Sequence, residues 1–347
     1  SSDVCSSDLM KITKILVALS FLFATVTANA GELTVTGNME ATYHTGQDQA
    51  TGNPLGMDRE LKFAGSTELD NGVSVSVMQD TSDNLGYGNS QLSFGNVAGF
   101  ATIYVGSDSD PLDAKDDITP SAYEEANGSG SGTYVDIGTM AGQMGLGVKF
   151  DLPILGAVNG KYYPKADGTK NADNASSGAT SATGSGESLT IVTNLADLPA
   201  VGGALDGATL TTGYSSHEES SVANTDDATE LTAALVYKTG ALSLGYQKKY
   251  NNPGNTVALT DPLFYKDEVI GIAYAVNDAF SISYNRYESR RHSVTADSSF
   301  KQETDAVNVG YTVGGMTIGL QDASTNNAGF VKDAKDDTRT LGISVAF

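Results

Sequence analysis

Apolar and polar residues alternate along most of the chain, in short segments separated by polar, glycine-containing connections. In ELTVTGNMEATY, which begins at Glu32, Leu33 and Val35 share one face, whereas Thr34 and Glu40 share the other. Successive side chains of a β-strand point to opposite faces, so a period of two predicts strands with one apolar and one polar face. A soluble sandwich rarely keeps such a polar face throughout.

This pattern predicts sixteen strands, most of them eight to eleven residues long. A tilted strand that crosses a bilayer needs about nine to eleven residues. A further short strand, TYVDIG, is an open alternative near residues 133–155. The predicted strands are 32–43, 59–69, 72–79, 89–95, 100–106, 143–151, 156–163, 187–195, 207–215, 229–238, 241–250, 266–276, 279–288, 303–313, 316–324 and 338–347.

The connections alternate between short and long, as the two rims of an outer-membrane barrel do. One connection, 196–206, should be short but is longer and carries Pro199. The short ones are 70–72, 96–99, 152–156, 239–240, 277–278 and 314–315. The long ones are 44–57, 80–88, 107–142, 165–186, 215–228, 251–265, 289–302 and 324–337.

No run of 18 or more apolar residues follows the N-terminal region, which excludes a membrane-spanning helix. Lipid offers no hydrogen-bond partner to an open sheet edge, so a membrane sheet must close. The prediction is an all-β, transmembrane, antiparallel up-and-down β-barrel of 16 strands. Sixteen strands enclose a lumen too wide for side chains to fill, so a polar inner face predicts a water-filled channel.

The N-terminal residues read as a targeting segment. Met10, Lys11 and Lys14 precede an apolar run that ends near Ala24, and Ala28-Asn29-Ala30 forms an A-x-A cleavage site. These are the three parts of a secretory signal peptide, so we expect residues 10–30 to be removed. Residues 1–9 fit no such segment and are interpreted as a non-native remainder, which leaves 31–347 as a single barrel domain.

Composition agrees with an exported, strand-rich chain. The formal net charge of −22 argues against nucleic acid as a partner. The only cysteine, Cys5, lies before the predicted cleavage site, so the mature chain has no disulfide. Abundant glycine (39) and tyrosine (16), without tryptophan, favour an all-β class.

Several segments resemble the general bacterial porin superfamily, especially the acidic porins of α-proteobacteria. They are GELTVTGNMEATY, RELKFAGSTELDNG, NSQLSFGNVAGFATIYVGS and the terminal TLGISVAF. The resemblance covers residues 31–347 as a pattern of strands. It implies a Gram-negative outer-membrane homotrimer in contact with lipopolysaccharide, and a long third loop folded into the lumen. It also implies a terminal Phe347 that the barrel-assembly machinery recognises.

The longest connection is rich in carboxylates, and in similar porins this loop lines the narrowest point of the pore. A ring of charge that faces an opposite ring selects ions. The candidate acidic residues are Asp108, Asp110, Asp113, Asp116, Asp117, Glu124 and Glu125. The candidate basic residues, which share the polar face of their strands, are Lys62, Lys149, Lys161 and Lys249. The excess of acidic residues predicts a preference for cations, although each loop carboxylate can equally be a solvated surface group.

The sequence DAKDD occurs at 113–117 and again at 333–337. Clustered carboxylates can hold Ca²⁺ through oxygen ligands, which makes Asp113, Asp116 and Asp117 candidate ligands. Neither copy has the spacing of an EF-hand loop, so no cofactor is expected beyond this candidate structural ion.

Enzyme signals are weak, and we expect no catalytic activity. His44, His217 and His292 lie in separate connections, without metal-ligand spacing or a nucleophile motif. The leading prediction is a channel for passive diffusion of small hydrophilic solutes and ions. A solute-specific channel for sugars or dicarboxylates on the same barrel is the main alternative, and a β-solenoid adhesin or a membrane-barrel enzyme are others.

Overall fold

The computed structural model describes residues 33–46, 53–82, 86–108, 110–126, 136–166, 184–199, 202–218, 226–254, 262–293 and 301–347. These residues form sixteen antiparallel strands that close into one barrel, each paired with its neighbours in sequence. The predicted signal peptide and the residues before it lie outside the described residues. No helix among the described residues is long and apolar enough to span a membrane.

Each predicted strand has a counterpart in the structure. The strands are β1 (Leu33–Gly46), β2 (Leu55–Glu68), β3 (Ser74–Ser82), β4 (Gly86–Val97), β5 (Ala101–Gly106), β6 (Gly145–Leu152), β7 (Gly156–Tyr163), β8 (Gly186–Asn194), β9 (Ala208–His217), β10 (Ala228–Thr239), β11 (Leu242–Asn252), β12 (Pro262–Ala275), β13 (Phe280–Ser293), β14 (Gln302–Val313), β15 (Met316–Asn326) and β16 (Lys335–Ala346). Most of the strands extend beyond the predicted ends, so most of the long connections are shorter than expected. The segment between β3 and β4, for example, is reduced to residues 83–85.

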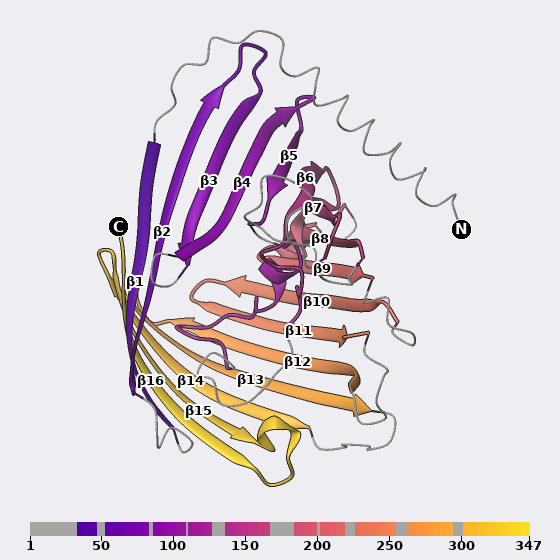
Figure 1. The fold of residues 1–347 in the computed structure, drawn as a ribbon. Coiled ribbons are helices and arrows are strands. Elements are labelled where there is room, and N and C mark those ends of the chain that lie inside the picture. The colour runs from indigo at the N-terminus through magenta and orange to yellow at the C-terminus, as the bar shows by residue number, and fades with distance from the viewer. Residues whose placement is uncertain are drawn as a thin grey trace.

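The barrel closes where the first and last strands meet (Figure 1). Asn38 pairs with Ala346 and Tyr43 with Leu341. The backbone of Phe347 exchanges two hydrogen bonds with Gly37, with N···O distances of 2.9 and 3.0 Å. The C-terminal residue therefore completes the seam, which leaves no free edge there.

The apolar face of every strand points outward. In β16, Leu341, Ile343 and Val345 are each more than 40% exposed, and Thr338 and Thr340 on the opposite face are buried inside the barrel. Such an apolar exterior, continued by Leu, Ile, Val and Tyr on neighbouring strands, suits contact with hydrocarbon rather than with water.

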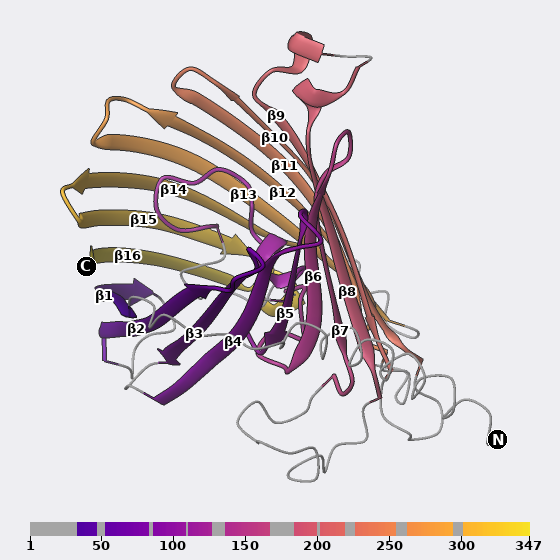
Figure 2. The same cartoon turned by 90° about the horizontal axis from the view of Figure 1, so that it is seen from above.

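Three of the described connections contain short 3₁₀ helices, one of which, η6 (Ala328–Phe330), lies between β15 and β16. The unusually long link between β8 and β9 contains two short 3₁₀ helices, η4 (Leu195–Asp197) and η5 (Gly202–Leu205). The link between β5 and β6 contains η3 (Asp113–Lys115) and passes through the interior of the barrel (Figure 2). Part of the TYVDIG segment lies outside the described residues, and its described part, from Asp136, forms no strand.

The buried apolar contacts lie inside the barrel, between this link and the wall. Ala126 packs with Val269, Tyr287, Ala306 and Ala323, which belong to β12, β13, β14 and β15. The core is therefore an interface between a loop and the inner surface of the sheet, rather than a filled barrel.

Candidate functional site

The link of residues 107–144, called the inner loop from here on, follows the inner wall. Its described parts are 107–108, 110–126 and 136–144. Leu112 contacts β8, where its backbone N–H donates to the hydroxyl of Ser188 at 3.2 Å. At its far reach, the hydroxyl of Tyr123 donates to Glu40 of β1 at 2.6 Å. The inner loop therefore follows the wall from β8 past the higher-numbered strands to β16, and across the seam to β1.

Carboxamide side chains on alternate strands satisfy the backbone of the inner loop. Gln247 of β11 donates to the carbonyls of Lys115 and Asp116 at 2.8 and 2.6 Å. Asn285 of β13 donates to the carbonyl of Pro120 at 2.9 Å, and Gln321 of β15 donates to two further loop carbonyls. Buried backbone groups need such partners, so these amides fix the path of the loop.

Inward-facing glycines make room for the inner loop. A Cβ atom at Gly271 would lie 2.7 Å from the carbonyl oxygen of Pro120, closer than real Cβ contacts allow. The same crowding against Leu112, Pro120, Ala122 or Tyr123 occurs at five other inward glycines, on β9, β11, β14, β15 and β16. These are Gly213, Gly245, Gly310, Gly319 and Gly342. Strand glycines here serve close approach of a second backbone.

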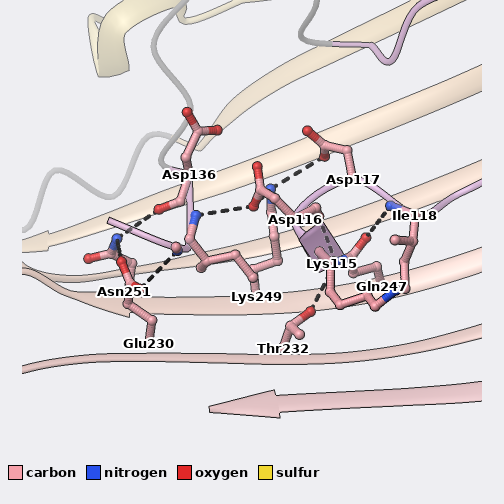
Figure 3. Close-up of polar contacts among 12 residues, drawn as sticks. Lys115, Asp116, Asp117, Ile118, Asp136, Glu230, Thr232, Gln247, Lys249 and Asn251 are labelled. Carbon is pink, nitrogen blue, oxygen red and sulfur yellow. Dashed lines mark hydrogen bonds and ion pairs between the residues drawn. The ribbon is translucent and has the colours of Figure 1, made fainter. Parts of the chain in front are cut away.

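An ion pair and a buried carboxylate complete the attachment (Figure 3). The ammonium of Lys249 lies 2.8 Å from Asp116 and 3.5 Å from Asp117. Glu230 of β10 accepts hydrogen bonds from the backbone N–H of Gly138 at 2.9 Å and from the hydroxyl of Ser215 at 2.7 Å.

The seven predicted acidic residues do not form one ring; they follow the course of the inner loop. Asp110 is buried near β8, where it accepts from the backbone N–H of Leu112 at 2.9 Å and from the hydroxyl of Ser188. Asp116 is buried against β11. The others are exposed or half-buried: Asp108, Asp113, Asp117, Glu124 and Glu125.

The four predicted basic residues all lie on the inward register but in two different settings. Lys161 is buried, and its ammonium donates to the carbonyl of Asp108 at 3.2 Å. Lys249 is buried behind Asp116. Lys149 lies half-buried over the ring of Tyr104, with 4.9 Å to the centroid, and Lys62 is exposed to the lumen. The wall that the loop leaves open therefore carries fewer positive charges than strand parity alone suggests.

Burial raises the pKa of five carboxyl groups of the inner loop, Asp110, Asp113, Asp116, Glu124 and Glu125. Burial, together with the charges of Glu125 and Glu40, raises the pKa of Glu124 to about 7. Burial, followed by the charges of Asp110 and Asp116, raises the pKa of Asp113 to about 6. Both groups therefore change charge near neutral pH.

Among the described residues, Asp116, Asp117 and Asp136 form a group of three carboxylates whose ligand atoms lie within 4.8 Å of one another. Asp113, a candidate calcium ligand by sequence, is absent from this group. The ammonium of Lys249 already contacts two of its members. Calcium binding stays a prediction, and the donor set that fits it includes Asp136 in place of Asp113.

The three histidines lie on three separate strands. His44 of β1 shares a hydrogen bond of 2.8 Å with Thr340, and His292 of β13 stacks on Phe264 with ring centroids 4.3 Å apart. His217 ends β9. This placement does not bring them together as a catalytic group.

Sequence reasoning missed the residues that seat the loop: the inward glycines, the carboxamides and Glu230. The sequence alone does show that each of these residues faces the inside of the barrel, because each lies on the polar face of its strand.

No protein-family model matches this chain, and no curated protein matches it. Solved structures do. A porin refined at 1.8 Å resolution matches with a TM-score of 0.62 and 13% identity, covering 91% of this chain and all of that chain. The anion-selective porin of Comamonas acidovorans matches with a TM-score of 0.61 and 14% identity over the same shares. OmpT, an outer membrane protein of Vibrio cholerae, matches with a TM-score of 0.62 and 11% identity, covering 93% of this chain and all of that one. The described part of the chain therefore has the fold of the sixteen-stranded bacterial porins.

Proposed function

We propose that this chain is an outer-membrane porin, a water-filled channel for passive diffusion of small hydrophilic solutes and ions. The observation that carries the proposal is the combination of an apolar exterior with a polar interior that the inner loop covers only in part. The part of the inner wall formed by β1–β4 contains a cavity. This cavity of about 250 Å³ is lined by Thr34, Lys62, Ser76, Gln91 and Asp108, among others.

We also propose that the channel prefers cations. The exposed inward side chains of β2 include Asp58 and Glu60 beside Lys62, and the inner loop presents Asp113 and Asp117. With Lys161 and Lys249 buried, carboxylates outnumber ammonium groups among these lumen-facing positions, which attracts cations. The Comamonas porin is anion-selective on the same fold, so the fold alone does not decide the sign.

The test is the current through the purified protein in a planar bilayer. We expect stepwise conductance, and a reversal potential in a potassium chloride gradient that favours potassium. A protein that inserts but conducts no ions would contradict the channel itself. Little current in salt, with block by one particular sugar, would support the solute-specific alternative.

Three further features belong to this proposal and derive from the porin resemblance. The channel assembles as a homotrimer, contacts lipopolysaccharide, and is recognised by the barrel-assembly machinery through Phe347, which is 63% exposed on the outer face. Export through a signal peptide predicts a mature N-terminus at Gly31, which N-terminal sequencing of the membrane form checks.

Cation preference should depend on pH. A carboxyl group loses its negative charge as the pH falls through its pKa, and those of Glu124 and Asp113 are raised to about 7 and about 6. We expect the reversal potential to move toward zero between about pH 8 and about pH 5, a range that brackets both values. In Glu124→Gln, the part of this change centred near neutrality should vanish. A preference constant over the whole range would contradict the assignment of these groups to the pore.

A further inference from the structure

Four inward side chains on two adjacent strands bind two separate parts of the inner loop at one place. These parts are the first limb, residues 115–118, and the returning limb, residues 136–138. The four side chains are Glu230 of β10, and Gln247, Lys249 and Asn251 of β11 (Figure 3). On the first limb, Gln247 binds the carbonyls of Lys115 and Asp116, and its own carbonyl oxygen accepts from the N–H of Ile118 at 3.2 Å. The amide of Gln247 thus binds three backbone groups within the four residues from Lys115 to Ile118.

The returning limb is attached to the same patch. The carboxylate of Glu230 accepts from the N–H of Gly138, and the amide of Asn251 donates to the carbonyl of Asp136 at 2.8 Å. Asp116 joins the two limbs, because its carboxylate accepts from the backbone N–H of Ile137 at 3.1 Å and from Lys249 at 2.8 Å. Both limbs and the wall therefore meet at one carboxylate.

Lys249 lies behind the loop, away from the open passage. Its side chain is fully buried, its ammonium lies 5.0 Å from the centre of the Tyr287 ring, and its partner across the strand pair is the buried Asp267. With Asp116 and Asp117 also in contact, its positive charge is compensated locally. A solute in the lumen cannot contact this ammonium group, whereas it can contact Lys62.

We propose that Lys249 is a positioning residue that clamps the inner loop to the wall and thereby sets the width of the passage, rather than a charge that solutes meet. The inference rests on the proposed channel function. The reason is electrostatic: without the ammonium, Asp116, Asp117 and Asp136 repel one another at short range, and a buried carboxylate left without its partner is strongly unfavourable. The loop would then move off the wall, and the width of the passage beside it would change.

The experiment compares Lys249→Gln with Lys248→Gln in planar bilayers. Lys248 is the neighbouring residue, points outward, and pairs with Glu268 at 3.0 Å, so it controls for loss of one charge from β11. Single-channel conductance and the size of neutral polyethylene glycols that enter the pore are measured together with the reversal potential. We expect Lys249→Gln to lose the wild-type size cut-off and to show fluctuating conductance. Lys248→Gln should keep the wild-type cut-off, and Lys249→Arg should restore it.

A different pattern would overturn the clamp. If Lys249→Gln keeps the cut-off and conductance and only shifts the reversal potential further toward potassium, Lys249 is a pore charge. Should Lys249→Gln fail to fold, Asp116→Asn provides the second test, because it removes the shorter of the two ion pairs of Lys249 while preserving an acceptor for Ile137. An unchanged cut-off in that variant likewise overturns the inference. Absence of conductance in the wild-type protein would instead contradict the proposed function.

Discussion

Replacing Glu230 by leucine is expected to lower the free energy of unfolding of the barrel by about 4.5–9 kcal/mol, since three hydrogen bonds to its carboxylate are lost and each bond to a charged group contributes about 1.5–3 kcal/mol. The Glu230 carboxylate is buried and accepts from Gly138, Ser215 and Asn251. Leucine accepts none of these bonds and leaves the donors buried without their partner. Denaturant unfolding in detergent micelles, followed by circular dichroism, measures the loss.

The matched control for this change is Glu187→Leu. Glu187 lies on the outward face of β8 and is exposed, so the same substitution there removes no buried acceptor. We expect stability within about 0.5 kcal/mol of the wild type, the usual range for surface changes. Glu230→Gln keeps one acceptor oxygen and should fall between the two. Wild-type stability in Glu230→Leu would show that the returning limb contributes little to the fold.

Strand positions and strand faces were predictable from alternation alone. Leu341, Ile343 and Val345 follow one another at a spacing of two, and only a strand places such residues on one face. The length of each segment and the alternation of short and long connections then determined the barrel. Strand ends were less accurate, because pairing beyond the apolar band depends on backbone hydrogen bonds that polar residues also make.

Depth inside the barrel was not predictable from parity. Lys62 and Lys249 share the inward face by the same rule, yet one is exposed to the lumen and the other is buried behind Asp116. Parity states which face a side chain occupies, but what covers that face depends on contacts between residues more than 100 positions apart. The sequence predicted one acidic ring opposite four lysines without taking into account that the inner loop covers some of these side chains. That acidic and basic groups face each other across the pore stays a prediction for the residues that are exposed to the lumen.

The path of the inner loop has a sequence signal that alternation alone does not use. Gly245 and Gly310 occupy inward positions in the middle of strands, where glycine normally weakens a sheet. Read together with inward carboxamides such as Gln247 and Gln321, they indicate a second backbone lying against the wall. Glycine provides space there, and the carboxamide satisfies a carbonyl.

Gly319→Val is expected to displace the inner loop while leaving the strand intact. Valine favours strands, so β15 itself should gain from the change. A Cβ atom at this position, however, would collide with the ring of Tyr123, whose hydroxyl bonds Glu40 on the far side of the barrel seam. Because the ring is held at both ends, it cannot yield cheaply, and overpacking of this kind costs about 1–3 kcal/mol.

The outward glycine Gly160 of β7 provides the control, since the nearest atom to a Cβ there is Leu189 Cδ1 at 3.6 Å, an ordinary contact. Gly160→Val should therefore fold with wild-type stability and conductance. Gly319→Val should unfold at a lower denaturant concentration and admit larger neutral polymers, because the segment around Tyr123 leaves its seat. If both variants behave alike, the glycine reflects a requirement of the strand itself, and the close approach of loop and wall does not set the dimensions of the passage.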